Sequence, residues 1–421
     1  MLTAVPLPTL KTTKFKIEMK LLITLFFMFI AASVIFAQDN NVSLENDYKN
    51  VAQKLLTSDS KLTIGGYGEV HYNQVLNKQT RDNAVLDAHR MVLFFGYNFS
   101  KKTQFVTEIE MEYANEVWVE QMFLQHKLND YVNLKAGMLL IPMGIINEYH
   151  EPTTFNGVER PVIDNKIAPS TWREVGVGLS GNILPLSLKY QLYLVNGPSS
   201  YDGTKGLFKG VDGIRGGRQK ASKSYMSAPN FTGKIEYIGF KGLNVGLSGY
   251  FGESQSKLYD KLDETNTALK LKADSSVVGI SMIGVDARYN NKGLELRGQF
   301  YYTSLSNTEK YNTFTRTGVK RNDLGSSMMG YYLEAGYNVL RFFEKSKMEL
   351  MPFVRYQDYN LHNTVDATLA VNNAYIANVI TTGLTLKLTK GAVVKADMDF
   401  AKTNTTTTRT VTFNAGIGVT F

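Results

Sequence analysis

Residues 409–421 read Arg409-Thr410-Val411-Thr412-Phe413-Asn414-Ala415-Gly416-Ile417-Gly418-Val419-Thr420-Phe421. Apolar side chains occupy every second position from Val411 to Phe421, and Thr, Asn or Gly occupies each position between them. This two-residue period predicts a strand with one apolar face and one polar face. Strands of outer-membrane β-barrels have this pattern, with aromatic residues at the membrane interface. An ordinary edge strand that ends by chance on an aromatic residue is the alternative.

The start of the chain has the pattern of an export signal. Four Lys residues precede an apolar run over residues 21–36, which ends at Ala37. A basic start, an apolar run and a small residue predict a signal peptide over residues 1–37, with Met19 as an alternative start. A membrane anchor is the other interpretation, but the run is shorter than the roughly 20 apolar residues that span a bilayer.

Residues 38–60 are polar and predict a lead segment on the periplasmic side, with a short helix between Ser43 and Leu56. The chain has no Cys, so its stability must come from backbone pairing and burial. Its 24 Tyr and 23 Phe against 2 Trp suit interfacial aromatic belts.

The net charge is weakly basic. The formal charge is +8, and residues 1–37 carry four Lys and one Glu, so the remaining chain carries +5. This balance permits anionic solutes without requiring them. The sequence has no tandem basic and aromatic motifs, so a nucleic-acid partner is not expected.

Residues 61–421 predict an all-β domain, a transmembrane antiparallel β-barrel of about sixteen strands. The expected strands cover residues 61–72, 87–99, 103–114, 117–128, 131–140, 173–183, 186–195, 228–238, 243–251, 277–289, 294–305, 328–339, 348–359, 375–388, 392–402 and 409–421.

The connectors support a barrel with two different ends. Tight turns rich in Gly or Asn alternate with longer polar segments. Short periplasmic turns and long extracellular loops are typical of outer-membrane barrels, and an even strand number leaves both termini on the periplasmic side. Two links fit less well, because residues 115–116 are short for a loop and residues 340–347 are long for a turn.

Charged residues occupy one face of several expected strands. Glu108, Glu110 and Glu112 alternate with apolar residues in the third strand, and Arg90 stands opposite them in the second. A charge in the middle of the bilayer costs about 2–4 kcal/mol, so this face must line a wet lumen. A periplasmic β-sandwich is the alternative, but sixteen strands are many for one sandwich. The faces of the fourth strand, residues 117–128, are not assignable because its parity is mixed.

Sixteen strands enclose an aqueous channel, whose selectivity depends on what narrows it. Residues 141–172 are the expected constriction loop, because this long connector is more apolar than a free surface loop. The charged candidates in and around it are Glu148, His150, Glu151, Glu159, Arg160 and Arg173. Mutual pairing that only holds the loop folded is the alternative role for each of them. For Arg90 and the three Glu residues of the third strand, structural bracing is favoured.

The loop at residues 196–227 contains a compact cationic patch. Its candidate residues are Lys209, Arg215, Arg218 and Lys220. Arg binds phosphate or carboxylate through two parallel hydrogen bonds, so the patch predicts attraction of anions at the pore mouth. Contact with anionic lipid, or a simple solvated loop, is the alternative.

Catalytic and metal-binding motifs are weak. His150-Glu151-Pro152 lacks the second His of a zinc motif, and Pro152 breaks the helix that such a motif needs. Glu69 and His71 share a strand face, which fits a wet lumen better than a metal. We therefore expect no enzyme activity, no metal and no cofactor. A structural or surface-interaction barrel and a barrel hydrolase are the alternatives to a channel.

These motifs together resemble the outer-membrane porin family that includes the phosphate-selective porins O and P. The resemblance is carried, in order along the chain, by Ala136-Gly137, Pro142-Met143-Gly144, Val158-Glu159-Arg160, residues 173–178, Asn196-Gly197, residues 215–220, Lys395-Ala396-Asp397 and Phe421. It implies a sixteen-stranded barrel in the outer membrane of a Gram-negative bacterium, a homotrimer of pores for small hydrophilic solutes or ions, and a third long loop inside the lumen.

The same resemblance implies that lipid surrounds the barrel and that the barrel assembly machinery recognises the last strand and Phe421. The sequence departs from the phosphate-selective members, because the expected constriction loop is net acidic and the third strand presents three Glu. The porin role is therefore expected, with at most a mild preference for anions or phosphate.

Overall fold

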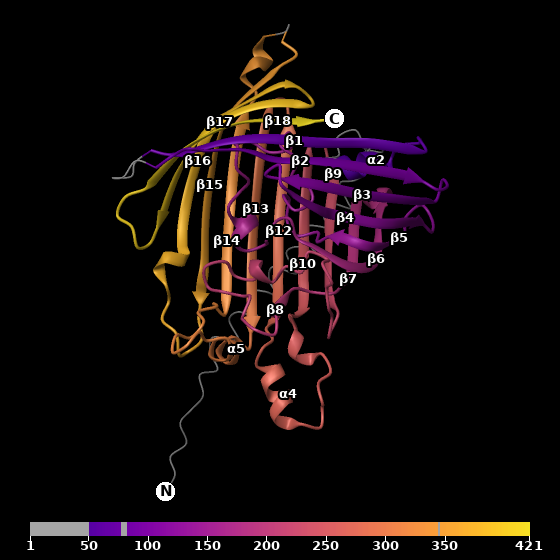
Figure 1. Cartoon of the computed structure of the whole chain (residues 1–421). Helices are drawn as coiled ribbons and strands as arrows, with labels where there is room; N and C mark the ends of the chain where they lie inside the picture. Colours follow the sequence, from indigo (N-terminus) through magenta and orange to yellow (C-terminus); the bar gives the residue numbers. More distant parts are fainter. Residues whose placement is uncertain (1–49, 77–81, 344–345) are drawn as a thin grey trace.

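The computed structural model describes residues 50–76, 82–343 and 346–421. The expected signal peptide and residues 38–49 of the lead segment lie outside this part of the chain. The described strands form a closed antiparallel barrel of sixteen strands (Figure 1), which confirms the predicted fold class.

Every expected strand has a counterpart in the barrel. The barrel strands are β1 Leu62–Val75, β2 Val85–Asn98, β3 Thr103–Glu112, β4 Glu116–Lys127, β5 Asn133–Leu140, β6 Arg173–Ile183, β7 Leu188–Val195, β9 Asn230–Phe240, β10 Leu243–Glu253, β12 Gly279–Asn291, β13 Leu294–Ser306, β14 Ser327–Tyr337, β15 Glu349–Thr364, β16 Ile376–Thr389, β17 Ala392–Thr403 and β18 Thr410–Thr420. Two short strands, β8 Ser199–Tyr201 and β11 Gln255–Ser256, form a separate two-stranded sheet in the connectors.

The described helices are short and lie in the lead segment and in the connectors between strands. The α-helices are α2 Val51–Leu56, α3 Ile163–Lys166, α4 Thr267–Asp274 and α5 Thr308–Phe314. The 3-10 helices are η2 Leu184–Leu186, η3 Arg215–Gly217, η4 Lys257–Tyr259, η5 Val339–Phe342 and η6 Asn373–Tyr375. Among the described residues, none of these helices has the length and apolar character that a membrane span requires.

The last strand closes the barrel against the first. β18 pairs with β1 in an antiparallel register that runs from Tyr67 opposite Thr420 to Val75 opposite Thr412. The backbone of Phe421 extends this ladder through two 2.9 Å hydrogen bonds with Gly66. Because Gly66 has no side chain, the Phe421 ring lies directly over it. The terminal strand is therefore the closing strand that its alternation predicted.

The alternation of side chains separates an apolar exterior from a polar lumen. Outward-facing apolar residues are exposed on strands all around the barrel, including Val70, Met91, Leu124, Val177, Phe231, Val285, Leu333, Val354, Val394 and Ile417. Inward-facing charged residues of the same strands are buried, including Glu69, Glu108, Asp286, Arg355 and Lys395. Such an outer face suits lipid, because apolar side chains avoid the cost of placing a charge in the bilayer.

A β-bulge explains the mixed parity of β4. Glu108 pairs with Gln121 and Ile109 pairs with Val119, so Glu120 has no partner in the ladder. Glu120 and Gln121 both point inward as a result, with exposed fractions of 0% and 5%. A second irregularity between β1 and β2 lies beside Glu69. Bulges re-aim side chains in this way, and they occur often beside functional sites.

The connectors differ between the two ends of the barrel. Helices α4 and α5 lie in long connectors at one end, where α4 projects away from the wall (Figure 1). The short link between β3 and β4 turns through Tyr113 and Ala114, which both have positive φ angles. The long link between β14 and β15 contains η5. These two local structures account for the two connectors of unusual length.

Candidate functional site

Residues 141–172, here called the constriction segment, lie within the barrel. The backbone N–H of Ile145 donates to Gln299 of β13 at 2.6 Å, and that of Val158 donates to Asp397 of β17 at 2.6 Å. Apolar side chains of the segment form a buried cluster with the inner wall, and they include Ile141, Met143, Ile145, Ile146, Phe155, Ile163, Ile167 and Trp172. The lumen is therefore partly filled rather than open across its full width.

Helix α2 also lies in the lumen, against the constriction segment. The Asn50 side chain caps the helix and donates to the backbone oxygen of Glu148 at 2.6 Å. The backbone N–H of Val51 donates to the Glu151 carboxylate at 2.8 Å. Leu55 packs against Gly96 on the inner face of β2. The described end of the lead segment is thus part of the lumen structure.

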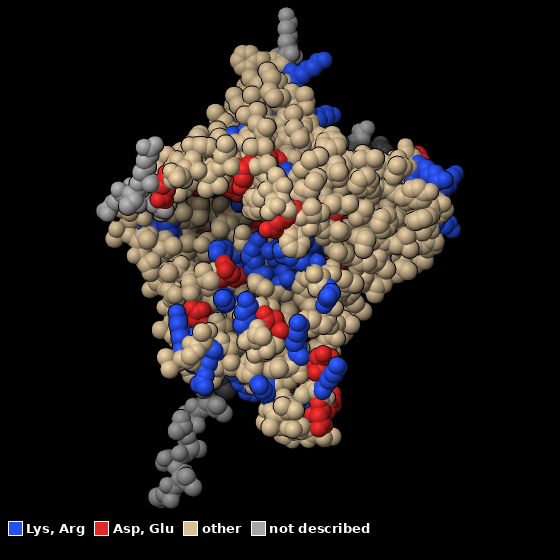
Figure 2. Space-filling view, viewed as in Figure 1, with Lys and Arg blue, Asp and Glu red and all other residues tan. Residues whose placement is uncertain are grey.

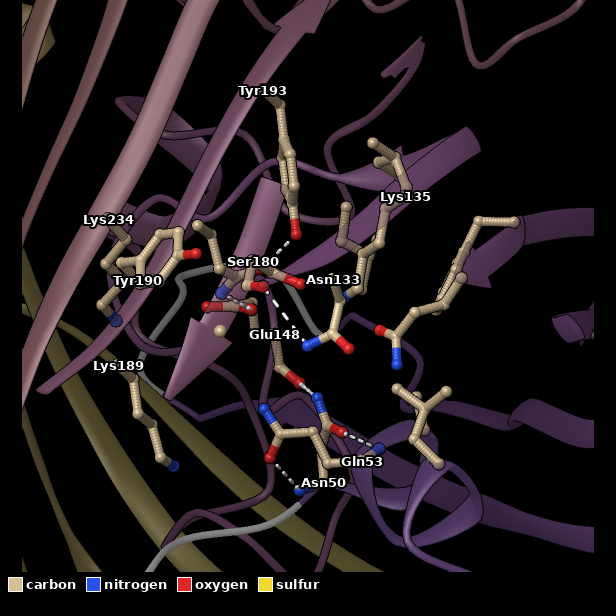
Figure 3. Close-up of a pocket in the computed structure, with 18 of the residues that line it drawn as sticks. Asn50, Gln53, Asn133, Lys135, Glu148, Ser180, Lys189, Tyr190, Tyr193 and Lys234 are labelled. Atoms are coloured by element: carbon tan, nitrogen blue, oxygen red, sulfur yellow. Dashed lines mark hydrogen bonds between the residues drawn. The ribbon is translucent and has the colours of Figure 1, made fainter. Parts of the chain in front are cut away.

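A cavity of about 250 Å³ lies beside α2, toward the short-turn end of the barrel. Figure 3 shows Asn50, which caps α2, and Gln53 of α2 close to Glu148, with lysine side chains from the wall around them. Those lysines are Lys135 on β5, Lys189 on β7 and Lys234 on β9.

A larger cavity of about 530 Å³ lies on the other part of the constriction segment, near the link between β3 and β4. Its positive lining residues are Arg90, Arg160, Arg173, Arg215, Arg218, Lys220 and Arg355. Its carboxylates are Glu69, Glu110, Glu112, Glu159 and Asp399. Figure 2 shows Lys and Arg side chains gathered at the centre of the face that it draws, beside a hollow. Seven cations against five carboxylates give this larger cavity a positive balance.

Two arginines of this cavity come from the connector at residues 196–227. Arg215 and Arg218 each donate to the backbone oxygen of Ser170, at 2.7 Å and 2.6 Å. Within the described part of the chain, no carboxylate forms an ion pair with either guanidinium. Burial lowers the pKa of Arg218, and repulsion from Arg215 and Arg173 lowers it further. Within the described residues, carboxylates such as Asp212 and Glu112 therefore act on this positive charge only at longer range than an ion pair.

Lys220 extends this positive region. Its ammonium group lies 4.2 Å from the ring centroid of Trp118 on β4. Burial lowers the pKa of Lys220, and repulsion from Arg218 and Arg173 adds to that effect. An anion that entered the cavity would relieve the repulsion among these groups.

The opposite part of the wall holds paired charges. Arg90 bridges Glu69 at 2.8 Å and Glu110 at 3.2 Å. His71 lies 3.3 Å from Glu69 and 3.2 Å from Glu159, so the strand wall and the constriction segment are linked here. Because Arg90 neutralises part of the charge of Glu69 and Glu110, these two carboxylates weaken the positive potential of the larger cavity less than two unpaired carboxylates would.

The residues predicted from the sequence lie in four places. The larger cavity is lined by Arg90, Glu110, Glu112, Glu159, Arg160, Arg173, Arg215, Arg218 and Lys220. Glu148 lines the smaller cavity, and Glu151 binds α2. Glu108 and His150 are buried with Glu120 outside both cavities. Lys209 is exposed and lines neither cavity, so it lies apart from the arginines of its own loop.

Three residues of these groups were missed as candidates. The alternation of β4 did not predict that Glu120 faces inward, because the bulge shifts which residues of β4 face the lumen. Arg355 lies on β15 far along the chain, and only closure of the barrel brings it to the constriction segment. Glu69 shares the inward face of β1 with His71, and that parity was a usable signal.

Comparison with known proteins supports this architecture. No family model matches the sequence. The outer membrane channel DcaP of Acinetobacter baumannii has a TM-score of 0.54 at 12% identity, over 86% of this chain and 97% of that chain. The anion-selective porin from Comamonas acidovorans has a TM-score of 0.53 at 12% identity, over 86% and 99% of the two chains. At a sequence identity of 12%, this structural similarity shows that the folds are alike.

A sequence relative is more similar. An uncharacterized protein of Aquifex aeolicus (strain VF5) is 30% identical over 359 residues, which cover 82% of this chain and 77% of that protein. A closed barrel with an apolar outer face is a structure of the Gram-negative outer membrane. The chain therefore belongs to the family of this Aquifex aeolicus protein, and its fold is the sixteen-stranded barrel of outer-membrane porins.

Proposed function

We propose that the protein is a passive outer-membrane channel for small hydrophilic solutes, with a preference for small anions. The observation that carries this proposal is that Arg215 and Arg218 line the larger cavity and that no carboxylate of the described residues forms an ion pair with them. Charges that line a constriction decide which ions pass it. The proposal makes the protein a channel rather than an enzyme.

The geometry favours weak and general recognition of anions. Arg215 and Arg218 line the larger cavity and each donate to a backbone oxygen of the constriction segment, so their charges attract a passing anion without forming a built binding site for it. Glu112 lines the same cavity, and it opposes tight binding of a multiply charged anion. A mild preference for monovalent anions follows, and a specific phosphate site is not part of the proposal.

A trimer is the proposed assembly, as the resemblance to porins implies. A solved outer membrane protein of Vibrio cholerae, described in its trimer form, has a TM-score of 0.51 at 10% identity. Light scattering of the detergent-solubilised protein measures the assembly mass, and a monomer mass would contradict a trimer.

Replacing Arg215 and Arg218 by Gln is expected to remove the anion preference. A unit charge about 5 Å from a passing ion contributes about 0.8 kcal/mol in water, which corresponds to about a fourfold change in permeability ratio per arginine before salt screening. Reversal potentials in planar bilayers under a KCl gradient measure this ratio. The wild type should favour chloride, and the double variant should lose that preference with a similar single-channel conductance.

Lys205→Gln is the matched control, because Lys205 is an exposed cation of the same loop and lines neither cavity. This control should keep the wild-type reversal potential. An unchanged potential in the Arg215 and Arg218 double variant would contradict the assignment of selectivity. Folded protein without any channel current would instead favour a structural barrel and reject the channel.

A further inference from the structure

A buried cluster outside both cavities has no role in the proposed channel. Glu108 of β3, Glu120 of β4 and His150 of the constriction segment meet in the barrel interior. Their exposed fractions are 0%, 0% and 2%. None of the three lines either cavity. We call these residues the buried triad.

The triad directs three unpartnered polar atoms at one point. Glu108 Oε1, Glu120 Oε2 and His150 Nε2 are all buried without a hydrogen-bond partner. His150 Nε2 lies 3.5 Å from the Glu108 oxygen and 3.3 Å from the Glu120 oxygen. Charge-assisted hydrogen bonds are shorter, at about 2.7–2.9 Å. Unpartnered buried atoms are rare in folded proteins, and a missing ion is one established cause.

The other polar atom of each triad side chain has a hydrogen-bond partner outside the triad. Gln121 donates to Glu108 Oε2 at 2.7 Å, and Arg173 donates to Glu120 Oε1 at 3.4 Å. His150 Nδ1 lies 3.1 Å from the backbone oxygen of Asn147, which fits an Nδ1–H that donates and leaves a lone pair on Nε2. Outer partners of this kind orient metal ligands and fix the tautomer of a ligating His.

The spacing of the three atoms fits a small divalent ion. Tetrahedral Zn²⁺ with bonds of about 2.0–2.2 Å places its ligand atoms about 3.3–3.5 Å apart. The two distances from His150 Nε2 to the carboxylate oxygens agree with this spacing between ligand atoms. All three ligand atoms lie within 4.8 Å of one another. Imidazole and carboxylate ligands suit Zn²⁺ among common ions.

The backbone supplies a separate reason to regard the triad as a built site. Glu120 reaches the lumen only because the bulge in β4 removes it from the ladder. Without the bulge, its neighbour Gln121 would continue the inward face alone. The bulge therefore turns a second carboxylate toward His150. Burial of that carboxylate costs free energy that an apolar residue at the same place would not cost.

We propose that Glu108, Glu120 and His150 bind a divalent transition-metal ion, with Zn²⁺ as the best match, that fastens the constriction segment to β3 and β4. The ion would join a loop to two wall strands by bonds that do not depend on the pore solute. A protonated His150 that shares one N–H between two carboxylates is the competing arrangement, and metal content separates the two.

The test measures metal bound by the full chain. Protein refolded in detergent with equimolar Zn²⁺ is desalted, and its zinc is counted by mass spectrometry. The wild type should hold about one Zn²⁺ per chain, and Glu120→Gln and His150→Gln should each retain at most about a tenth of that amount. Co²⁺ in place of Zn²⁺ should give a visible absorption band that both variants lack. The gel shift on heating shows which variants are folded, and Glu108→Gln replaces any that is not.

Two histidine controls make the assignment specific. His126→Gln alters a strand His outside the triad, and it should keep the bound zinc. His89→Gln alters the other group of His and carboxylate residues, which contains His71 and Asp87, and it should also keep the zinc. Zinc loss in His89→Gln, or a wild type that holds no more zinc than His150→Gln, would overturn the proposal.

Discussion

Deletion of residues 50–57 is expected to raise the single-channel conductance about twofold, because a helix about 10 Å across leaves the lumen of a sixteen-stranded barrel. Helix α2 buries Val51, Ala52 and Leu55 against the inner wall. Its removal widens the short-turn end of the pore beside the smaller cavity. The measurement is single-channel recording of the refolded protein in planar bilayers.

The deletion should also increase the current noise of the open channel. Asn50 and the N–H of Val51 hold the constriction segment through the Glu148 backbone oxygen and the Glu151 carboxylate. Without α2, the Glu151 carboxylate loses a buried donor, which costs about 1–3 kcal/mol. The constriction segment therefore gains freedom near Glu148, and its fluctuations modulate the current.

An engineered disulfide tests the position of α2 without removing it. The chain has no Cys, so Leu55→Cys with Gly96→Cys introduces the only two thiols. A Cβ atom at Gly96 would lie 3.1 Å from that of Leu55, slightly below the range of about 3.5–4.5 Å for disulfides, so a small shift allows the bond. The oxidised variant should conduct like the wild type, because α2 stays in place.

Deletion of residues 260–275 is the matched control for chain loss, because α4 projects from the barrel (Figure 1) and should leave the conductance unchanged. If the deletion of residues 50–57 alters neither conductance nor noise, α2 does not lie in the ion path. Failure of the two thiols to cross-link would contradict the lumen position itself.

The barrel was predictable because its signal is local. Each strand alternates apolar and charged residues over about ten positions, as in β3 and β17, and lipid outside and water inside enforce that pattern. By the same rule Glu110 and Arg90 face the lumen, and both side chains are buried in the structure. The constriction segment was recognisable because an apolar connector needs a buried surface to cover it.

The contents of the lumen were less predictable, because they depend on contacts between distant parts of the chain. The bulge at Glu120 leaves the composition of β4 unchanged and alters only its register with β3. Lys209 and Arg215 are close in sequence, yet one is exposed and the other lines the larger cavity. The three-dimensional fold of a loop decides which of its residues are exposed. A loop sequence has no regular hydrophobic period from which that fold could be predicted.

Replacing Arg355 by Met is expected to destabilise the barrel by about 3–5 kcal/mol, because it leaves a buried carboxylate without its main partner. Arg355 Nε donates to Glu334 at 2.7 Å, and both side chains are at most 2% exposed. Arg355 also donates to the backbone oxygens of Asn156 and Glu159, so it fastens the constriction segment to β15. Chemical unfolding in detergent, followed by Trp fluorescence, measures the loss.

Trp172 gives this experiment a local readout. Its side chain is 1% exposed and lies 4.5 Å from the Tyr250 ring, between centroids, so release of the constriction segment should change its emission before the barrel unfolds. Arg316→Met is the control, because Arg316 is exposed in a connector and should cost within about 0.5 kcal/mol.

The double variant Arg355→Met with Glu334→Gln separates charge burial from packing. Removal of both charges abolishes the unpaired carboxylate, so most of the stability should return, as happens when buried ion pairs are replaced by neutral groups. The two donations from Arg355 to the backbone of the constriction segment stay lost, so the early change in Trp172 emission should persist. Full recovery of both signals would show that Arg355 does not fasten the segment, and no recovery of stability would show that its packing outweighs its charge.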